Sequence, residues 1–191
     1  MTQVRNVAVI VGSLRKDSVS RKLAKAFGAL TPNLKFNIVE IGDLPHFDQD
    51  LESDPPAQWV RFRQEIADAD AVLFVTPEYN RSVPGVLKNA IDVGSRPYGS
   101  SVWNGKPGAV ISQSPGAIGG FGSNHHLRQS LVFLNVPLLS QEAYLGNSFA
   151  LFDENGELIN ESTGEFLRAY GVQFSAWIET ISPASATAKA A

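Results

Sequence analysis

Short apolar runs that alternate with amphipathic segments place the strongest constraint on what this chain can fold into. Residues 7–11 (VAVIV), 71–75 (AVLFV) and 108–112 (GAVIS) are the clearest of these runs. Strands that are buried on both faces of a parallel sheet are apolar along their whole length and rich in β-branched residues. Because parallel strands are joined by right-handed crossovers, the segments between the runs are expected to form helices on the sheet.

The remaining elements are predicted from the spacing of the apolar side chains. Val19, Leu23, Phe27 and Leu30 fall on one stripe of a helix, as do residues at helical spacing within 59–69, 85–93, 123–134 and 166–181. The run Asp54-Pro55-Pro56 marks the start of the second helix, because an acid and prolines suit a helix N-terminus. Two further strands are predicted, one over 36–41 and one beginning at 136–139. Five strands and five helices in alternation predict a doubly wound α/β sheet.

The same pattern sets the expected domain organisation. Residues 1–181 are predicted to form a single domain, because the chain shows no internal repeat, no linker and no second core. Residues 182–191 are rich in Ala, Ser and Thr and have little to bury, so a disordered tail is expected there.

Composition excludes several classes of chemistry. The 191 residues include no cysteine, which removes disulfides, thiolate catalysis and cysteine-held metal sites, so redox chemistry would require a bound cofactor. Lys and Arg number 16 against 19 acids, a net charge of −3 that argues against a nucleic-acid partner. Apolar runs fall short of a membrane span, and the polar start lacks a signal pattern. A cytoplasmic protein is therefore expected.

Three loops are selected as the place for a ligand, because doubly wound sheets bind ligands outside the carboxyl ends of their strands. Loop 1 (residues 12–20, GSLRKDSVS) runs into a predicted helix start, where free amides and the helix dipole favour an anion. Hydroxyls and a guanidinium add donors suited to a phosphate. An ordinary capped helix with a solvated basic turn is the alternative. Neither the P-loop pattern nor G-x-G-x-x-G is present, which favours a mononucleotide.

Loop 2 (residues 76–85, TPEYNRSVPG) and loop 3 (residues 114–122, SPGAIGGFG) complete this edge. Prolines near both ends of loop 2 can hold its backbone donors in fixed positions for a flat heterocycle. Four glycines in loop 3 let a ring approach the backbone, and Ile118 and Phe121 can cover an apolar face. Either loop, taken alone, could also be purely structural.

These motifs together resemble one family. Residues 12–15 (GSLR), PEYN at 77–80 followed by LKNAID at 87–92, and the glycine pair at 119–120 are similar to the NAD(P)H-dependent FMN reductases, and in particular to their bacterial quinone/chromate reductase branch. The resemblance runs from about residue 7 to the helix after residue 122. It implies a flavodoxin-like sheet of order 2-1-3-4-5, non-covalent FMN, and NADPH or NADH as the electron donor for quinones, chromate and other acceptors by a ping-pong scheme.

The resemblance also implies which residues bind. Cofactor contacts are expected from loop 1 (Ser13, Leu14, Arg15, Ser18 and Ser20), from loop 2 (Pro77, Glu78, Tyr79, Asn80 and Arg81) and from loop 3 (Ser114 and Gly116). Substrate contacts are expected from Arg81, Arg96, Gly119 and Phe121, with no metal and no catalytic side chain beyond the flavin. A homodimer or homotetramer is implied, and a charged fraction of 18% fits surface that is covered between subunits.

Other interpretations stay open for several residues. Arg96 could instead form a surface or interface salt bridge. His125 and His126 could bind a metal, but adjacent helical side chains point about 100° apart, which favours packing or hydrogen bonding. Arg128 and Glu142 could pair between subunits or within the chain.

At the level of the whole protein, a flavodoxin-type electron carrier and a flavin-binding sensor remain the rival functions. The modest net charge and Arg15 argue against the carrier. A serine hydrolase is disfavoured because G-x-S-x-G is missing.

Overall fold

A computed structural model describes residues 4–182 and contains one five-stranded sheet. Its strands are β1 (Arg5–Val11), β2 (Leu34–Val39), β3 (Ala71–Pro77), β4 (Gly108–Gln113) and β5 (Ala143–Leu145). They lie in the order β2-β1-β3-β4-β5, and every neighbouring pair is parallel. The predicted flavodoxin-like order is confirmed.

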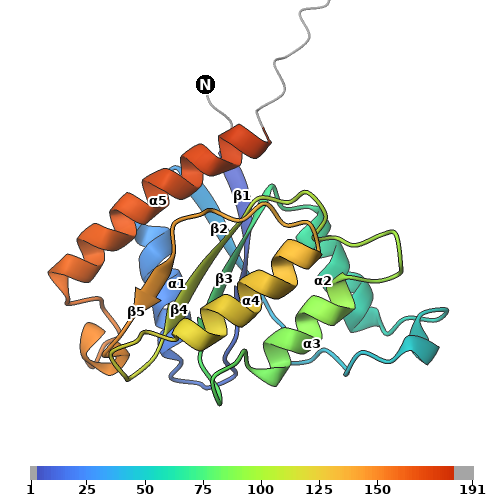
Figure 1. The fold of residues 1–191 in the computed structure, drawn as a ribbon, viewed down its shortest axis with the longest axis horizontal. Coiled ribbons are helices and arrows are strands. Elements are labelled where there is room, and N and C mark those ends of the chain that lie inside the picture. Colours follow the sequence, from blue (N-terminus) through green and yellow to red (C-terminus); the bar gives the residue numbers. More distant parts are fainter. Residues whose placement is uncertain (1–3, 183–191) are drawn as a thin grey trace, which may run out of the picture.

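Helices cover both faces of the sheet (Figure 1). The helices α1 (Val19–Leu30) and α5 (Glu161–Ile181) pack on one face. The opposite face is covered by α2 (Ala57–Ala67), α3 (Gly85–Gly94) and α4 (Phe121–Phe133). Two short 3₁₀ helices, η1 (Gln49–Leu51) and η2 (Ser148–Leu151), lie in the connections that follow β2 and β5. Because side chains alternate along a strand, Val7 and Val9 enter the core under α1 while Ala8 and Ile10 enter the other core.

The predicted fifth strand is wrong in position. Residues 136–139 touch β4 only through a bridge between Gly108 and Leu138, and the strand itself spans Ala143–Leu145. Pro137 has no amide to donate to a ladder. The carbonyls of Leu139 and Gln141 accept hydrogen bonds from the Arg128 guanidinium, at 2.9–3.1 Å. A longer strand would need the missing amide of Pro137 and the carbonyls of Leu139 and Gln141, which already accept hydrogen bonds from Arg128.

The ends of several other elements also differ from the sequence prediction. The second strand is Leu34–Val39 rather than 36–41, and α2 begins at Ala57, directly after the proline pair. The last helix starts at Glu161, five residues early, because the Asn160 side chain accepts from the amide of Thr163 at 2.9 Å and caps it. Of the predicted tail only Ser182 belongs to the described residues; 183–191 lie outside them.

No helix between residues 4 and 182 is both long enough and apolar enough to cross a bilayer.

Candidate functional site

The carboxyl ends of the strands meet along the lower edge in Figure 1, and the three selected loops lie there. The chain runs from β1 to its neighbour β2 and then crosses back past β1 to β3, so the strand order reverses between β1 and β3 and makes that edge the switch point of the sheet. Gly12 sits at this edge, where its amide donates to the Val75 carbonyl at 2.9 Å. A Cβ on Gly12 would lie 3.0 Å from Thr76 Oγ1, so loops 1 and 2 are closely packed where they begin.

Loop 1 presents a helix start with unused donors. Ser18 caps α1 by accepting from the Arg21 amide at 3.2 Å. The first-turn amides of Val19 and Ser20 have no acceptor within residues 4–182. Ser13, Ser18 and Ser20 are buried, while Leu14 and Arg15 extend into solvent. Free amides beside an exposed cation are what a phosphate requires.

Loop 2 forms a tight hairpin. Tyr79 and Ser82 exchange two backbone hydrogen bonds of 3.0 Å, and Asn80 and Arg81 turn the chain with φ of 51° and 63°. A non-glycine pair in the left-handed region is an uncommon conformation that clusters at ligand sites. The turn places Asn80 and Arg81 at an exposed tip, with 76% of the Arg81 side chain accessible to solvent.

Glu78 connects loop 2 to the start of α4. Its Oε2 accepts from the amide of Gly122 at 2.7 Å and from that of Ser123 at 3.3 Å. The α4 N-cap is Gly120, which has no side chain to cap the helix, so the Glu78 carboxylate takes that role from another loop. The carboxylate thus faces α4, an arrangement that the sequence did not indicate.

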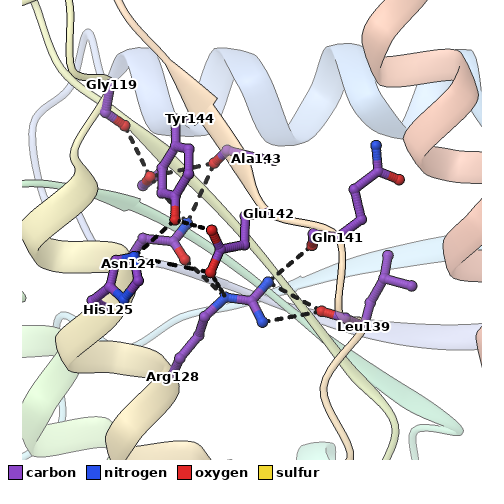
Figure 2. A network of polar contacts seen from close by, with 10 residues as sticks. Gly119, Asn124, His125, Arg128, Leu139, Gln141, Glu142, Ala143 and Tyr144 are labelled. Carbon is purple, nitrogen blue, oxygen red and sulfur yellow. Dashed lines mark hydrogen bonds and ion pairs between the residues drawn. The ribbon is translucent and has the colours of Figure 1, made fainter.

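A network of buried polar groups holds loop 3 in place (Figure 2). Ser112 Oγ donates to the Gly119 carbonyl at 2.8 Å and accepts from Asn124 Nδ2 at 3.1 Å. Ser112 and Asn124 are fully buried. Gly119 has φ of 61°, and a Cβ there would lie 2.7 Å from the Leu145 amide nitrogen. Loop 3 is therefore packed directly against β5, and only glycine fits at its tightest point.

His125 and His126 contact different partners and do not point to a common site. His125 Nε2 lies 3.0 Å from the Tyr144 hydroxyl, whereas His126 Nδ1 lies 3.0 Å from Ser82 Oγ. Within residues 4–182 no group of His, Asp and Glu is arranged to hold a metal ion. Burial and the neighbouring Glu142 carboxylate, which accepts from the Tyr144 hydroxyl, raise the pKa of Tyr144 to about 12. The histidines thus serve packing and hydrogen bonding at the start of α4.

Arg128 lies in the same network and pairs within the chain. Its Nε is 3.8 Å from the Glu142 carboxylate and donates to Asn124 Oδ1 at 2.9 Å. Figure 2 shows the guanidinium surrounded by these acceptors and by the carbonyls that precede β5. Arg128 and Glu142 therefore form an ion pair within the chain, which was one of the two predicted alternatives.

Within the described chain, Arg96 lies apart from the three loops. It follows the last turn of α3, about 15 Å along that helix from the end of loop 2. Its guanidinium is 3.4 Å from Glu52 and 5.7 Å from the ring centre of Phe47. Both partners belong to the connection after β2, so Arg96 reaches them rather than the strand edge.

Two buried side-chain oxygens at the strand edge have no hydrogen-bond partner, and they indicate whether the site fits a flavin phosphate and its sugar chain. Gln113 Oε1, at the end of β4, has no hydrogen-bond partner, and Gln113 Nε2 donates to Ser20 Oγ at 3.1 Å. Ser148 Oγ is also without a partner, although its residue is fully buried. An unsatisfied buried polar group costs about 1–3 kcal/mol, which a polar ligand can relieve. Together with the free amides of α1, these atoms fit a phosphorylated, polyhydroxylated cofactor.

Comparisons with known proteins agree with this geometry. The family model for NADPH-dependent FMN reductases matches residues 5–150. A quinone reductase of Pseudomonas putida is 60% identical over 94% of this chain and 97% of its own. A 2-hydroxy-1,4-benzoquinone reductase of a Burkholderia species is 48% identical over 90% and 95%.

Among solved structures, FerB of Paracoccus denitrificans, a flavoenzyme NAD(P)H:(acceptor) oxidoreductase, superimposes with a TM-score of 0.87. It is 44% identical, with coverage of 93% of this chain and 98% of its own. The family match spans all three loops and all five strands of the sheet. The chain therefore belongs to the family of NADPH-dependent FMN reductases.

Proposed function

We propose that the protein is an FMN-dependent NAD(P)H:quinone oxidoreductase. The observation that carries the proposal is the set of three loops around the β1/β3 edge, with free donors at one end and exposed apolar side chains at the other. Relatives named for quinone reduction that cover nearly the whole chain support this substrate class.

The cofactor would be held by all three loops. Ser13, Arg15, Ser18 and the amides of Val19 and Ser20 would bind the phosphate at the start of α1, with Leu14 beside them. The hairpin of loop 2 (residues 77–81) and the loop 3 residues Ser114 and Gly116 would line the ring. Bound FMN supplies two-electron redox chemistry between the nicotinamide and the acceptor, while the chain binds and orients the reactants.

The exposed apolar residues around these loops suit a flat aromatic acceptor. Leu14, Tyr79, Ile118 and Phe121 are 47–59% exposed although all are large and hydrophobic. Such side chains at a site edge are typical of binding surfaces for apolar ligands. Gly119, which was expected to contact the substrate, is instead buried against β5, so it would shape loop 3 from behind this surface. The exposed Arg81 offers anionic acceptors such as chromate a cation to approach.

NAD(P)H and the acceptor would use the same place in turn, which is a ping-pong scheme. NAD(P)H would bind beside these loops and leave before the quinone binds there, and FMN held by the loops would supply the redox chemistry between the two. Arg96 would contribute to NAD(P)H binding only from a neighbouring subunit, because in its own protomer it lies a helix length from the loops.

A homodimer or homotetramer is part of the proposal. Val132 and Phe133 of α4 are 64% and 88% exposed, and large exposed apolar side chains favour burial against a second copy. We place the protein in the cytoplasm, where NAD(P)H is supplied, and take residues 1–181 as one FMN-binding domain.

Steady-state kinetics test the proposal. FMN-loaded protein is assayed with NADPH or NADH against benzoquinones and chromate, and parallel double-reciprocal lines are expected. If the protein binds FMN and oxidises neither nicotinamide nucleotide, the proposed activity is wrong and the protein is an electron carrier or a flavin-binding sensor.

A further inference from the structure

His125 carries one ring nitrogen for which the described chain supplies no partner. Its Nε2 lies 3.0 Å from the Tyr144 hydroxyl, and 45% of the side chain is exposed. Within residues 4–182 its Nδ1 makes no hydrogen bond. Histidine is the side chain that exchanges protons most readily near neutral pH. The structure thus holds a proton-exchanging ring on one side and leaves the other side open.

The imidazole lies at the loop 3 end of α4, beside the surface proposed for the acceptor. Its ring centre is 4.2 Å from that of Phe121, one turn earlier in the helix. Helical side chains lean toward the N-terminus of their helix, which for α4 is the end that follows loop 3. Phe121 is half-exposed and belongs to the apolar residues around the loops. An acceptor that packs on Phe121 would therefore lie within reach of His125.

The hydrogen bonds around Tyr144 determine which nitrogen of His125 carries the proton (Figure 2). The Tyr144 hydroxyl has one proton, which it donates to the Glu142 carboxylate. Its oxygen can then only accept from His125, so Nε2 is the donor of that contact. The neutral ring keeps its lone pair on Nδ1, and the protonated ring presents an N–H there.

Glu142 completes a chain of three groups that holds the ring in place. Its carboxylate lies 3.9 Å from His125 Nε2 and 3.8 Å from Arg128 Nε. The imidazole is also nearly parallel to the Tyr144 ring, with an angle of 11° between the planes and 6.2 Å between the centres. A proton-transferring group whose far side is held by a second and a third residue is typical of catalytic sites.

We propose that His125 is the proton donor in quinone reduction, a catalytic role beyond its hydrogen bond to Tyr144. The inference rests on the proposed quinone reductase function. A quinone that takes up a hydride gains two electrons and one proton and becomes a hydroquinone monoanion. Its charged oxygen then takes the Nδ1 proton of the imidazolium, which leaves a neutral hydroquinone and a neutral imidazole. Water afterwards returns a proton to Nδ1. This step adds a side chain to a reaction for which the family resemblance implies none.

The test compares a benzoquinone with ferricyanide, which accepts one electron at a time and takes up no proton. His125→Gln is expected to lower kcat/KM for the benzoquinone about tenfold and to leave ferricyanide reduction unchanged. General acids contribute about 10²–10⁴-fold, and the smaller loss is expected here because water reaches this exposed ring and replaces it in part.

His126→Gln is the matched control. His126 is the next residue of α4, but its Nδ1 lies 3.0 Å from Ser82 Oγ instead of the Tyr144 hydroxyl. Both acceptors should be reduced by this variant at the rate of the unaltered protein.

Ring nitrogen chemical shifts, measured by NMR on the FMN-loaded protein, give a readout that does not depend on activity. The neutral ring of His125 should carry its proton on Nε2. Tyr144→Phe removes the oxygen that accepts from Nε2, so this variant should lose the preference for that tautomer. It should also lose part of the benzoquinone activity, and none of the ferricyanide activity.

An unchanged kcat/KM for the benzoquinone in His125→Gln would overturn the inference and leave the proposed function standing. An equal loss with ferricyanide would also overturn it, because a proton donor acts on the quinone alone. A proton found on Nδ1 of the neutral ring would contradict the assigned direction of the hydrogen bonds. If the unaltered protein oxidises NAD(P)H with neither acceptor, the proposed function itself fails, and the inference fails with it.

Discussion

Replacing Glu78 with Gln tests whether a carboxylate from loop 2 holds loop 3 and the start of α4. The carboxylate accepts from the amides of Gly122 and Ser123 at 2.7 and 3.3 Å, and only 14% of its side chain is exposed. Hydrogen bonds to a charged acceptor contribute about 1.5–3 kcal/mol against about 0.5–1.5 for neutral ones. The helix dipole adds about 0.3–1 kcal/mol.

Glutamine keeps an oxygen acceptor and loses the charge, so Glu78→Gln should reduce the free energy of unfolding by about 1–2 kcal/mol. For a chain of this length that corresponds to a melting temperature about 2–8 °C lower. Urea and thermal unfolding of the apo-protein, followed by circular dichroism, measure the change. Glu154→Gln is the control, because Glu154 is exposed and makes no ion pair in the described chain. A Glu78→Gln protein as stable as this control would refute the capping role.

Three further predictions use the same structure. Gly119→Ala should lower the free energy of unfolding by at least about 1–2 kcal/mol in urea melts, because φ is 61° and its Cβ would meet the Leu145 amide nitrogen at 2.7 Å; Gly116→Ala, whose nearest contact would be 3.7 Å, should not. Tyr144 and Tyr170 have pKa values raised to about 12 from 10.0, so the unfolded chain loses these protons first and stability should fall as pH rises from 10 to 12. Tyr170→Phe should flatten that fall in urea melts taken across this range, and an unaltered slope would count against it. Arg96→Ala should raise the Michaelis constant for NADPH or chromate if Arg96 acts across a subunit boundary. Unchanged Michaelis constants would show that Arg96 does not act in the site and serves only its ion pair with Glu52.

Four of the strands could be located because their apolar runs show in the sequence that they are buried, whereas the order of the sheet was implied only by the family resemblance. Val7 to Val11 is apolar at every position, and the structure buries each of these side chains on one face or the other. The fifth strand has three residues, too few to show any period, and its middle residue Tyr144 is polar at its tip. Its place is set by Arg128, whose guanidinium takes the carbonyls before it. Such a contact between a helix and a distant segment leaves no local pattern.

In the candidate site, too, one part could be predicted from the sequence and another could not. The three loops could be located from topology, since the ends of parallel strands must meet at one edge. The directions of side chains within the loops could not. Glu78 is a loop residue whose carboxylate faces α4, and Ser148 follows a strand that the sequence places elsewhere. Both depend on how β5 and α4 pack, which is decided by tertiary contacts rather than by spacing.

The central claim is that one bound FMN passes electrons from NAD(P)H to a quinone at the edge defined by these loops. The most direct measurement is the absorbance of FMN-reconstituted protein under anaerobic conditions, with NADPH added first and a benzoquinone second. NADPH should bleach the blue flavin band, and the quinone should restore it at once. A protein that takes up no FMN, or whose flavin band is unchanged by both NADPH and NADH, would contradict it.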